Sequence, residues 1–390
     1  MLIDGDYAFM KALVVGCGNI GSVAAEDLAR TMKAVEVVVA DNDKTRAEAM
    51  AKKIGTENIS SITLNVSDRE KTVKTLKNYD VILGFLPGKL GYRFIETCID
   101  AGKDLVDVSY MAENPLELNS KAVKAGVTIV PDCGLAPGIS NFLVGHAANK
   151  LDNVKAVHIM VGGLPETPVP PLGYVITWSP ESLIDEYTRK AGIIQKNKKV
   201  EVEALTGLEE IVFPIIGRLE AFYTDGLRTL MHTIKGEEMW EKTLRYPGHA
   251  EKITTLEALG FFDEKPVNIG NAEVSPRKLA IKLLAQKLWR PEIRDVVALK
   301  TEVSGIAKGK QVNYVYQMLD FYDKKHGITA MARTTAYPAS IVAQMLLRKA
   351  VKEKGIVPPE KIGTHDELFK KFIAELENRG IHVGEETAES

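Results

Sequence analysis

A glycine-rich turn between an apolar strand and an amphipathic helix is the feature that most constrains the fold of this chain. The turn has the spacing Gly16-x-Gly18-x-x-Gly21, it follows the apolar residues 12–15, and a helical pattern of apolar residues runs over 20–30. This order is typical of the first unit of a doubly wound parallel sheet. In such a unit the glycines allow a tight turn and a close approach to a pyrophosphate, and the start of the helix attracts phosphates. We therefore predict that the chain binds a dinucleotide.

An acidic residue at the end of the second predicted strand indicates which dinucleotide is bound. Asp41 follows the apolar residues 35–39 and lies twenty positions after the last glycine of the turn. A carboxylate at this point of the fold accepts hydrogen bonds from the adenosine ribose and repels a 2′-phosphate, which favours NAD over NADP. Two alternatives stay open. Asp41 or Asp43 only caps the next helix and does not bind the ribose, or Lys44 and Arg46 bind the 2′-phosphate of NADP.

Short apolar runs alternate with helical patterns through the first third of the chain, which predicts further strands of the same sheet. The runs cover residues 62–64, 81–83, 105–108 and 127–130, and the helical patterns include 70–77 and 90–100. Ligands bind at the carboxyl ends of strands in such sheets, although each of these segments also suits an ordinary strand-to-helix turn. The predicted dinucleotide site comprises Gly16, Gly18, Asn19, Ile20, Gly21, Asp41, Asn42, Asn65, Val66, Phe85, Leu86, Pro87 and Tyr110.

From about residue 154 the pattern changes, which predicts a second domain of the α+β type. Residues 312–318 alternate apolar and polar side chains, as half-exposed antiparallel strands do, and a helical pattern returns over 331–349. The predicted fold is α/β, with a Rossmann-type doubly wound parallel sheet and a second α+β domain that contains an antiparallel or mixed sheet. We place the dinucleotide domain at 1–140, completed by 330–390, and a substrate-binding and oligomerisation domain at 141–329. Residues 385–390 are expected to be frayed.

Charge and cysteine content exclude several classes of protein. The chain has 50 basic and 52 acidic residues, so it carries no net field that attracts nucleic acid or an anionic membrane, and we expect a small-molecule partner. Cys17, Cys98 and Cys133 lack the spacing of a metal site and fit a reducing cytoplasm. No zinc-protease or serine-hydrolase motif occurs, and no segment has the apolar length of a membrane span. We therefore expect a cytoplasmic protein without a metal, with Met10 as an alternative start to Met1.

The densest group of reactive side chains in the second domain lies at residues 242–252. Arg245 offers a planar fork that matches a carboxylate, and His249 titrates near neutral pH. Both flank a Pro-Gly turn, where functional groups are often displayed, although a solvated surface turn is the alternative. A cleft between two domains is a common substrate site, so other polar residues are also candidates. These are Asp132, Tyr174 and Thr224, each of which also suits a plain turn or core position.

Seven segments, in order along nearly the whole chain, carry a family resemblance. They read VVGCGNIGSVAAEDLA, GVTIVPDCGLAPGISN, VGGLPETPVPPLGY, LEAFYTDG, TLRYPGHAEK, TAMARTTAY and GIVPPEKI. Together they resemble the saccharopine dehydrogenase-like family, most closely its lysine 6-dehydrogenase members. The resemblance implies an NAD-dependent enzyme that oxidises the ε-amine of L-lysine to 2-aminoadipate 6-semialdehyde, which cyclises to piperideine-6-carboxylate, with release of ammonia. It also implies a homo-oligomer, a dimer or tetramer, built through the second domain.

The resemblance assigns expected roles to the candidate residues. The glycines of the turn and Asp41 keep the dinucleotide pattern of the family, and the segments expected to face substrate contain Tyr174, Thr224, Arg245 and His249. We expect Arg245 to hold the α-carboxylate of lysine. An amine with a pKa of about 10.4 must become neutral before a hydride leaves its carbon. The base that takes this proton stays open among His249, Asp132 and a bound water.

Two other functions fit the same sequence. One is a saccharopine-type or carboxynorspermidine-type reductase that uses NADPH; its substrates carry more carboxylates and need further cations, for which Arg218, Arg228 and Lys252 are available. The other is a non-catalytic protein that senses a dinucleotide and changes partners with its redox state. A preference for NADPH without ammonia release indicates the first, and binding of NADH without turnover indicates the second.

Overall fold

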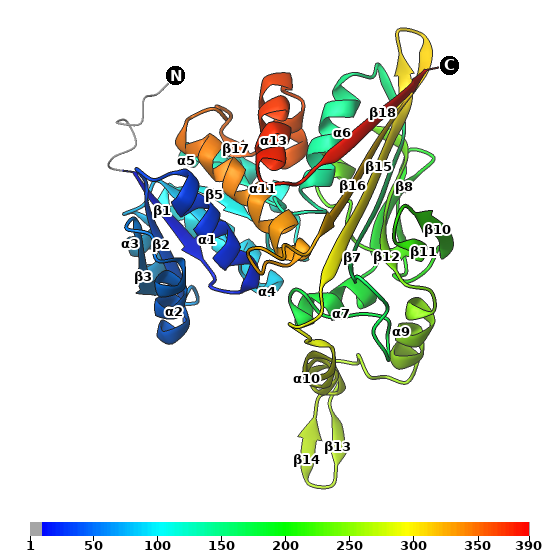
Figure 1. Cartoon of the computed structure of the whole chain (residues 1–390), viewed down its shortest axis with the longest axis horizontal. Coiled ribbons are helices and arrows are strands. Elements are labelled where there is room, and N and C mark those ends of the chain that lie inside the picture. Colours follow the sequence, from blue (N-terminus) through cyan, green and yellow to red (C-terminus); the bar gives the residue numbers. More distant parts are fainter. Residues whose placement is uncertain (1–9, 390) are drawn as a thin grey trace. The chain divides into compact units, whose positions relative to one another are not determined.

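The computed structural model describes residues 10–389 and divides into two compact units (Figure 1). Unit 1 comprises residues 1–149 and 332–381, and unit 2 comprises residues 150–331 and 382–390. The suggestion that Met10 is an alternative start concerns residues 1–9, which lie outside the described residues, as does Ser390. Within the described residues, the division differs from the predicted boundaries in three segments, 141–149, 330–331 and 382–389.

Unit 1 is built on a seven-stranded sheet with the order β17-β6-β5-β4-β1-β2-β3. All of its neighbouring strands pair in parallel. The strands are β1 (Lys11–Val15), β2 (Glu36–Asp41), β3 (Ile59–Thr63), β4 (Val81–Gly84), β5 (Asp104–Asp107), β6 (Thr128–Val130) and β17 (Gly355–Ile356). The order reverses direction between β1 and β4, which is the point where doubly wound sheets bind ligands. The predicted Rossmann-type sheet is confirmed.

Some helices of unit 1 begin or end at capping residues that the sequence supplies. The Asp43 side chain accepts a hydrogen bond from the N–H of Arg46 at the start of α2, and Gly55 ends that helix with a φ of 63°. Gly102 ends α4 in the same left-handed conformation. The helical segments are α1 (Asn19–Thr31), α2 (Lys44–Ile54), α3 (Arg69–Leu76), α4 (Gly88–Ala101), η2 (Pro115–Leu118), α5 (Asn119–Ala125), α6 (Ile139–Asn149), α11 (Ala330–Leu347), α12 (Pro359–Gly363) and α13 (Asp366–Asn378).

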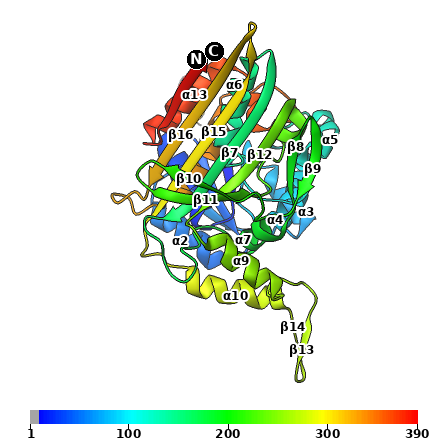
Figure 2. The same cartoon turned by 90° about the vertical axis from the view of Figure 1, so that its right-hand side faces the viewer.

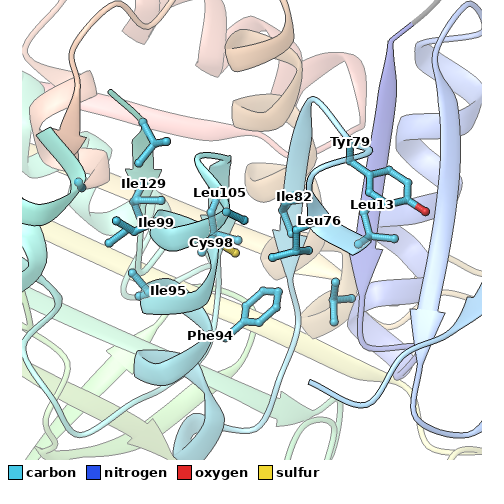
Figure 3. Close-up of a cluster of buried hydrophobic side chains, with 14 of the residues drawn as sticks. Leu13, Leu76, Tyr79, Ile82, Phe94, Ile95, Cys98, Ile99, Leu105 and Ile129 are labelled. Atoms are coloured by element: carbon cyan, nitrogen blue, oxygen red, sulfur yellow. The ribbon is translucent and has the colours of Figure 1, made fainter. Parts of the chain in front are cut away.

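The core of unit 1 holds the sheet at a fixed position under its helices. Figure 3 shows Phe94, Ile95 and Ile99 of α4 beside Ile82 of β4 and Leu105 of β5. All five side chains are buried, and burying each one stabilises the fold by about 1.5–3 kcal/mol. This packing fixes the carboxyl ends of the strands, where the predicted dinucleotide residues lie.

Helix α6 belongs to unit 1, so the predicted domain boundary at residue 140 lies too early. The amide nitrogen of Asn141 donates to Oε2 of Glu360 in α12 at 3.0 Å. A Cβ at Gly145 would lie 2.0 Å from the carbonyl oxygen of Glu360, so the two helices are in close contact. The C-terminal segment thus binds α6 to the first unit, a contact between residues that are far apart in the sequence.

Unit 2 contains a nine-stranded mixed sheet. Figure 2 shows strands β7, β12, β15 and β16 of this sheet side by side. Its main path is β10-β11-β12-β7-β15-β16-β18, and β8 pairs with β12 and β9. β12 and β7 pair in parallel, and the other pairs are antiparallel. The strands are β7 (Asn153–Pro165), β8 (Ala191–Gln195), β9 (Lys198–Val202), β10 (Glu209–Phe213), β11 (Gly217–Tyr223), β12 (Gly236–Arg245), β15 (Asp295–Ala307), β16 (Lys310–Phe321) and β18 (Val383–Glu389). The predicted second domain with a mixed sheet is confirmed.

The end of the chain forms strand β18, and the prediction of a frayed end is wrong for residues 385–389. β18 pairs antiparallel with β16 from Met318 to Val312, at the edge of the sheet of unit 2. Its side chains are mostly exposed and acidic, so the sequence lacks the apolar alternation that marks a buried strand. Strand β18 is held by its pairing with β16, which its own side-chain pattern does not predict.

Helices pack against one end of this sheet, and a small hairpin extends beyond α10 (Figures 1 and 2). The helices are α7 (Pro180–Thr188), α8 (Leu230–Thr233), α9 (His249–Ala258) and α10 (Pro276–Leu288), and the hairpin is β13 (Val267–Ile269) with β14 (Ala272–Val274). α7 begins with Pro180, after Ser179, whose hydroxyl accepts from the N–H of Ser182 at 3.2 Å. Over residues 10–389 no helix is both long and apolar enough to cross a bilayer.

Candidate active site

The glycine turn is closely packed at two of its glycines and open at the third. Gly16 has a φ of +105°, and a Cβ there would lie 2.3 Å from the carbonyl oxygen of Phe85. A Cβ at Gly21 would lie 2.0 Å from the carbonyl oxygen of Gly16, so the fold itself requires both glycines. Apart from Gly18 and its two neighbours in the chain, no heavy atom of the described residues lies within 4 Å of a Cβ added at Gly18. Gly18 also precedes α1, which has no side-chain cap and no acidic residue in its first turn, so this cradle fits a pyrophosphate.

We expect Gly18→Ala to weaken NADH binding at least tenfold, because the new methyl group occupies the space left for the pyrophosphate. Gly18 has an extended backbone that alanine adopts easily, so the free energy of unfolding should change by no more than about 1 kcal/mol. The matched variant Gly21→Ala should lower that free energy by at least about 2 kcal/mol, since its Cβ meets the backbone. Fluorescence titration and denaturant unfolding measure the two effects. If Gly18→Ala binds NADH as tightly as wild type does, the pyrophosphate does not bind at Gly18.

The other predicted dinucleotide residues follow neighbouring strands of the sheet. Because these strands are parallel, their carboxyl ends lie along one edge. The Phe85 N–H donates to the carbonyl oxygen of Val15 at 2.8 Å, which ties the segment after β4 to the end of β1. The residues are Asp41 and Asn42 at β2, Asn65 and Val66 after β3, Phe85, Leu86 and Pro87 after β4, and Tyr110 after β5, while Asn19 and Ile20 begin α1.

Asp41 is buried at the end of β2 and is bonded to the glycine turn. Its Oδ2 accepts from the N–H of Cys17 at 2.8 Å, and its Oδ1 accepts from the N–H of Asp43 at 3.0 Å. Burial, and then the charge of Asp41, raise the pKa of the Cys17 thiol to about 12, so this thiol stays protonated. Each Asp41 oxygen keeps a second lone pair that a ribose hydroxyl can use. Asp43, not Asp41, caps α2.

The four candidates from the second domain lie in one cluster of unit 2 that is joined by hydrogen bonds and by ring contacts. Arg245 ends β12, His249 begins α9, Thr224 follows β11, and Tyr174 precedes α7. Four further residues, Glu186, Tyr187, Glu241 and Thr243, complete the cluster.

Arg245 is held at the centre of this cluster by an acid and an aromatic ring. Its Nη2 donates to Oε2 of Glu186 at 2.9 Å, and its Nη1 donates to the carbonyl oxygen of Leu244 at 2.9 Å. Its guanidinium carbon lies 4.6 Å from the centre of the Tyr174 ring. The side chain is only 3% exposed, and Glu186 compensates its charge. The Tyr174 ring and these hydrogen bonds fix the plane of the guanidinium.

Both ring nitrogens of His249 are engaged in hydrogen bonds in this conformation. Its Nδ1 lies 2.9 Å from the carbonyl oxygen of Leu172, which can only accept, so Nδ1 carries the proton. Its Nε2 therefore accepts from the Tyr187 hydroxyl at 2.8 Å. Burial, followed by the charge of Arg245, lowers the pKa of His249 to about 3. The structure thus supports a positioning role for His249 in place of the proton acceptor that its residue type suggested.

A second chain of hydrogen bonds leads from Glu241 to the partner of Arg245. Thr224 Oγ1 lies 2.5 Å from Oε2 of Glu241 and 2.8 Å from Oγ1 of Thr243. Thr243 Oγ1 lies 2.7 Å from Oε1 of Glu186. The sequence held a signal for part of this set, because residues 241, 243 and 245 alternate along one strand and so share a face. It held none for Glu186 and Tyr187, which come from α7.

The remaining candidates lie elsewhere. Asp132 follows β6 in unit 1, is 1% exposed and has a φ of 54°. Arg218 and Lys252 are exposed in unit 2, and Arg228 lies 4.0 Å from Asp225. No group of three or more His, Cys, Asp or Glu side chains among residues 10–389 has the arrangement of a metal site.

Comparisons with protein families match nearly the whole chain. Residues 12–130 match the saccharopine dehydrogenase NADP binding domain, and residues 134–381 match the saccharopine dehydrogenase C-terminal domain. The chain belongs to the saccharopine dehydrogenase family. It is therefore an oxidoreductase with a dinucleotide-binding domain, and the family resemblance stated from the sequence is confirmed.

Relatives within the saccharopine dehydrogenase family differ in name and length. The chain is 25% identical to saccharopine dehydrogenase [NADP(+), L-glutamate-forming] of Saccharomyces cerevisiae, over 97% of this chain and 99% of that protein. It is 21% identical to carboxyaminopropylagmatine dehydrogenase of Synechocystis sp., over 95% and 96% of the two chains. With alpha-aminoadipic semialdehyde synthase of Arabidopsis thaliana it shares 24% identity and spans 37% of that protein's length. The solved apo saccharopine dehydrogenase of S. cerevisiae has the same fold, with a TM-score of 0.78 at 21% identity over 97% of this chain and 100% of that one.

Proposed function

We propose that this member of the saccharopine dehydrogenase family is an NAD-dependent dehydrogenase that oxidises the ε-amine of L-lysine to 2-aminoadipate 6-semialdehyde, which cyclises to piperideine-6-carboxylate, and releases ammonia. The observation that carries the proposal is the composition of the unit 2 cluster, in which the guanidinium of Arg245 is linked to the carboxyl groups of Glu186 and Glu241. A guanidinium suits a single α-carboxylate, and because Glu186 already compensates its charge, the cluster offers no further positive charge for additional carboxylates.

The charge balance of unit 2 supports lysine over a substrate with several carboxylates. Other largely buried cations there also lie beside acids: Arg228 lies 4.0 Å from Asp225, which Arg189 shares at 3.5 Å, Lys242 lies 2.6 Å from Glu209, and Arg277 is bonded to Asp185. The additional carboxylates of a saccharopine-type substrate require further cations, beyond those that are already paired with these acids. Lysine brings one carboxylate and two amines, so it needs one guanidinium.

The proposed reaction converts a protonated amine, NAD⁺ and water into an aldehyde, ammonium, NADH and a proton. When bound, the dinucleotide accepts the hydride from the ε carbon. Arg245 holds the α-carboxylate and so fixes the position of the far end of the lysine chain. Removal of the amine from water lowers its pKa from about 10.4 toward the neutral form. Both nitrogens of His249 are engaged in hydrogen bonds, so we propose that a bound water accepts the amine proton.

The carboxylate of Asp41 supports NAD as the coenzyme. We expect Asp41→Ser to shift the ratio of kcat/KM for NAD to kcat/KM for NADP at least tenfold toward NADP, because it removes a charge that repels a 2′-phosphate. Asp43→Ser is the matched control: it removes an acid two positions away and keeps a side chain that caps α2. An unchanged ratio in Asp41→Ser, or an equal shift in the control, would contradict the assignment of Asp41 to the ribose.

A reductase that uses NADPH is the second candidate. The names of the S. cerevisiae relative, saccharopine dehydrogenase [NADP(+), L-glutamate-forming], and of the matched NADP binding domain favour it. An assay with L-lysine, L-ornithine and saccharopine, each with NAD or NADP, separates the functions. The proposed function requires reduced coenzyme and ammonia from L-lysine with NAD. Turnover of saccharopine with NADP and without ammonia would replace the proposal with the reductase. Binding of NADH without turnover of any of these substrates would replace it with a dinucleotide-sensing function.

We also propose that the enzyme is a homo-oligomer built through unit 2. Large apolar side chains are exposed on the hairpin and on α10, among them Ile269 (61% exposed) and Leu279 (44% exposed). A second copy that covers them would remove this apolar surface from water. We expect the double variant Ile269→Asp, Leu279→Asp to dissociate the oligomer in light scattering, and Val123→Asp in unit 1, exposed by 49%, to leave its mass unchanged. A monomeric wild-type protein would contradict the proposal.

A further inference from the structure

A series of hydrogen bonds joins Glu241 to Glu186 through two threonine hydroxyl groups. This series has three oxygen-to-oxygen contacts, but the two hydroxyl groups supply only two protons. Three oxygen-to-oxygen contacts join four groups: Glu241 to Thr224 at 2.5 Å, Thr224 to Thr243 at 2.8 Å, and Thr243 to Glu186 at 2.7 Å. Each threonine supplies one proton, and an ionised carboxylate supplies none. A third proton must therefore lie on one of the two carboxyl groups at the ends of the chain.

The surroundings decide which carboxyl group holds this proton. Glu186 accepts from Arg245 at 2.9 Å and forms an ion pair with this guanidinium. Glu241 is 2% exposed and packs against Gly226, and the charged groups that act on it are Glu186, Asp225 and Arg245. Burial is the main cause that raises the pKa of Glu241, and the nearby carboxylates of Glu186 and Asp225 add to it. The charge of Asp225 is itself shared with Arg189 at 3.5 Å and Arg228 at 4.0 Å.

We propose that Glu241 is a neutral carboxylic acid in the folded protein at neutral pH and is a positioning residue for Arg245. The proton on Glu241 fixes the direction of donation along these hydrogen bonds. Glu241 donates to Thr224, Thr224 donates to Thr243, and Thr243 donates to Glu186. Glu186 is thereby fixed with one oxygen on Thr243 and the other on Arg245. Only the effect of this chain on substrate binding rests on the proposed function; the proton on Glu241 does not.

The pH dependence of stability tests the proton on Glu241 without any substrate. A carboxyl group whose pKa is raised on folding binds its proton more tightly in the folded state, so its contribution to stability is lost as pH rises from the ordinary value of 4.5 to the folded value. Over that window the unfolding equilibrium constant of wild type, divided by that of Glu241→Gln, should rise by up to about tenfold per pH unit. Denaturant titrations between pH 5 and 8 measure this ratio. Glu273→Gln, exposed on β14, is the control and should give a constant ratio.

Infrared spectroscopy tests the same proton in the wild-type protein. With ¹³C-labelled glutamate, wild type at pH 7 should show the carbonyl band of a protonated carboxyl group, and Glu241→Gln should lack it. The absence of this band in wild type, or a constant stability ratio for Glu241→Gln, would overturn the inference whether or not the protein oxidises lysine.

Kinetics test the positioning role. Glu241→Leu should raise KM for L-lysine about tenfold with a smaller effect on kcat, because it leaves Glu186 and Arg245 less well fixed. Glu241→Gln keeps an N–H donor toward Thr224 and should recover most of this loss. Equal KM values for Glu241→Leu and wild type would overturn the positioning role. If lysine is not a substrate at all, the proposed function fails while the stability and infrared results still decide the protonation of Glu241.

Discussion

Arg245→Ala is expected to raise KM for L-lysine by about a hundredfold and to lower the free energy of unfolding by about 3–5 kcal/mol. The kinetic effect follows from loss of the guanidinium that we assign to the α-carboxylate. The loss of stability follows from the largely buried Glu186 carboxylate, which would keep its charge but lose its partner at 2.9 Å. Steady-state kinetics and denaturant unfolding of the same preparation measure both.

A double variant separates the two effects of Arg245. Arg245→Ala combined with Glu186→Gln removes the unpaired charge, so it should regain most of the lost stability and none of the lysine affinity. Recovery of a wild-type KM in the double variant would contradict a contact between Arg245 and substrate. It would leave Arg245 with the structural task of compensating Glu186.

Acidification from pH 6.5 to 3 is expected to remove about 4–5 kcal/mol of stability through His249 alone. Its pKa of about 3 in the folded protein lies below the ordinary value of 6.5, so the unfolded chain binds more protons in this window. The contribution of His249 to the free energy of unfolding is complete above pH 6.5. It is lost as pH falls, at about 1.4 kcal/mol per pH unit. Protonation of Nε2 would also break the hydrogen bond from Tyr187.

The comparison of wild type with His249→Gln isolates this effect, because glutamine does not titrate. The difference between their free energies of unfolding should shrink steadily as pH falls below 6.5. His382→Gln, at an exposed histidine after α13, should follow wild type at every pH. A difference between wild type and His249→Gln that stays constant with pH would show that His249 keeps its ordinary pKa and is accessible as a base.

The parts of the fold that local sequence determines were predicted. The turn at Gly16, Gly18 and Gly21 depends on backbone freedom within six residues, and the alternation of strands and helices depends on short apolar patterns. Strand β18 was missed, since its order comes from pairing with β16 and not from its own exposed, acidic side chains. The boundary after α6 was misplaced for a similar reason: Asn141 is bonded to Glu360, 219 positions away.

The candidate site divides in the same way. Arg245 and His249 were predicted because they share a short segment with a Pro-Gly turn. Glu186 and Tyr187 lie 59 and 58 positions from Arg245, and only the packing of α7 brings them to it. The residue type of His249 suggested a base, but its protonation depends on burial and on the carbonyl group of Leu172, 77 positions away. The chemical type of a residue can thus be taken from the sequence. The protonation state of a buried group, in contrast, depends on neighbours that are distant in the sequence.

Transfer of deuterium from the ε carbon of lysine tests the proposed reaction most directly. Purified protein would be incubated with NAD and L-lysine that carries two deuterium atoms on that carbon, and the coenzyme and ammonium would be quantified. We predict NADH that contains one deuterium atom, formed in equal amount with ammonium. Unlabelled NADH, or no reduction of NAD by lysine, would contradict oxidation at the ε carbon.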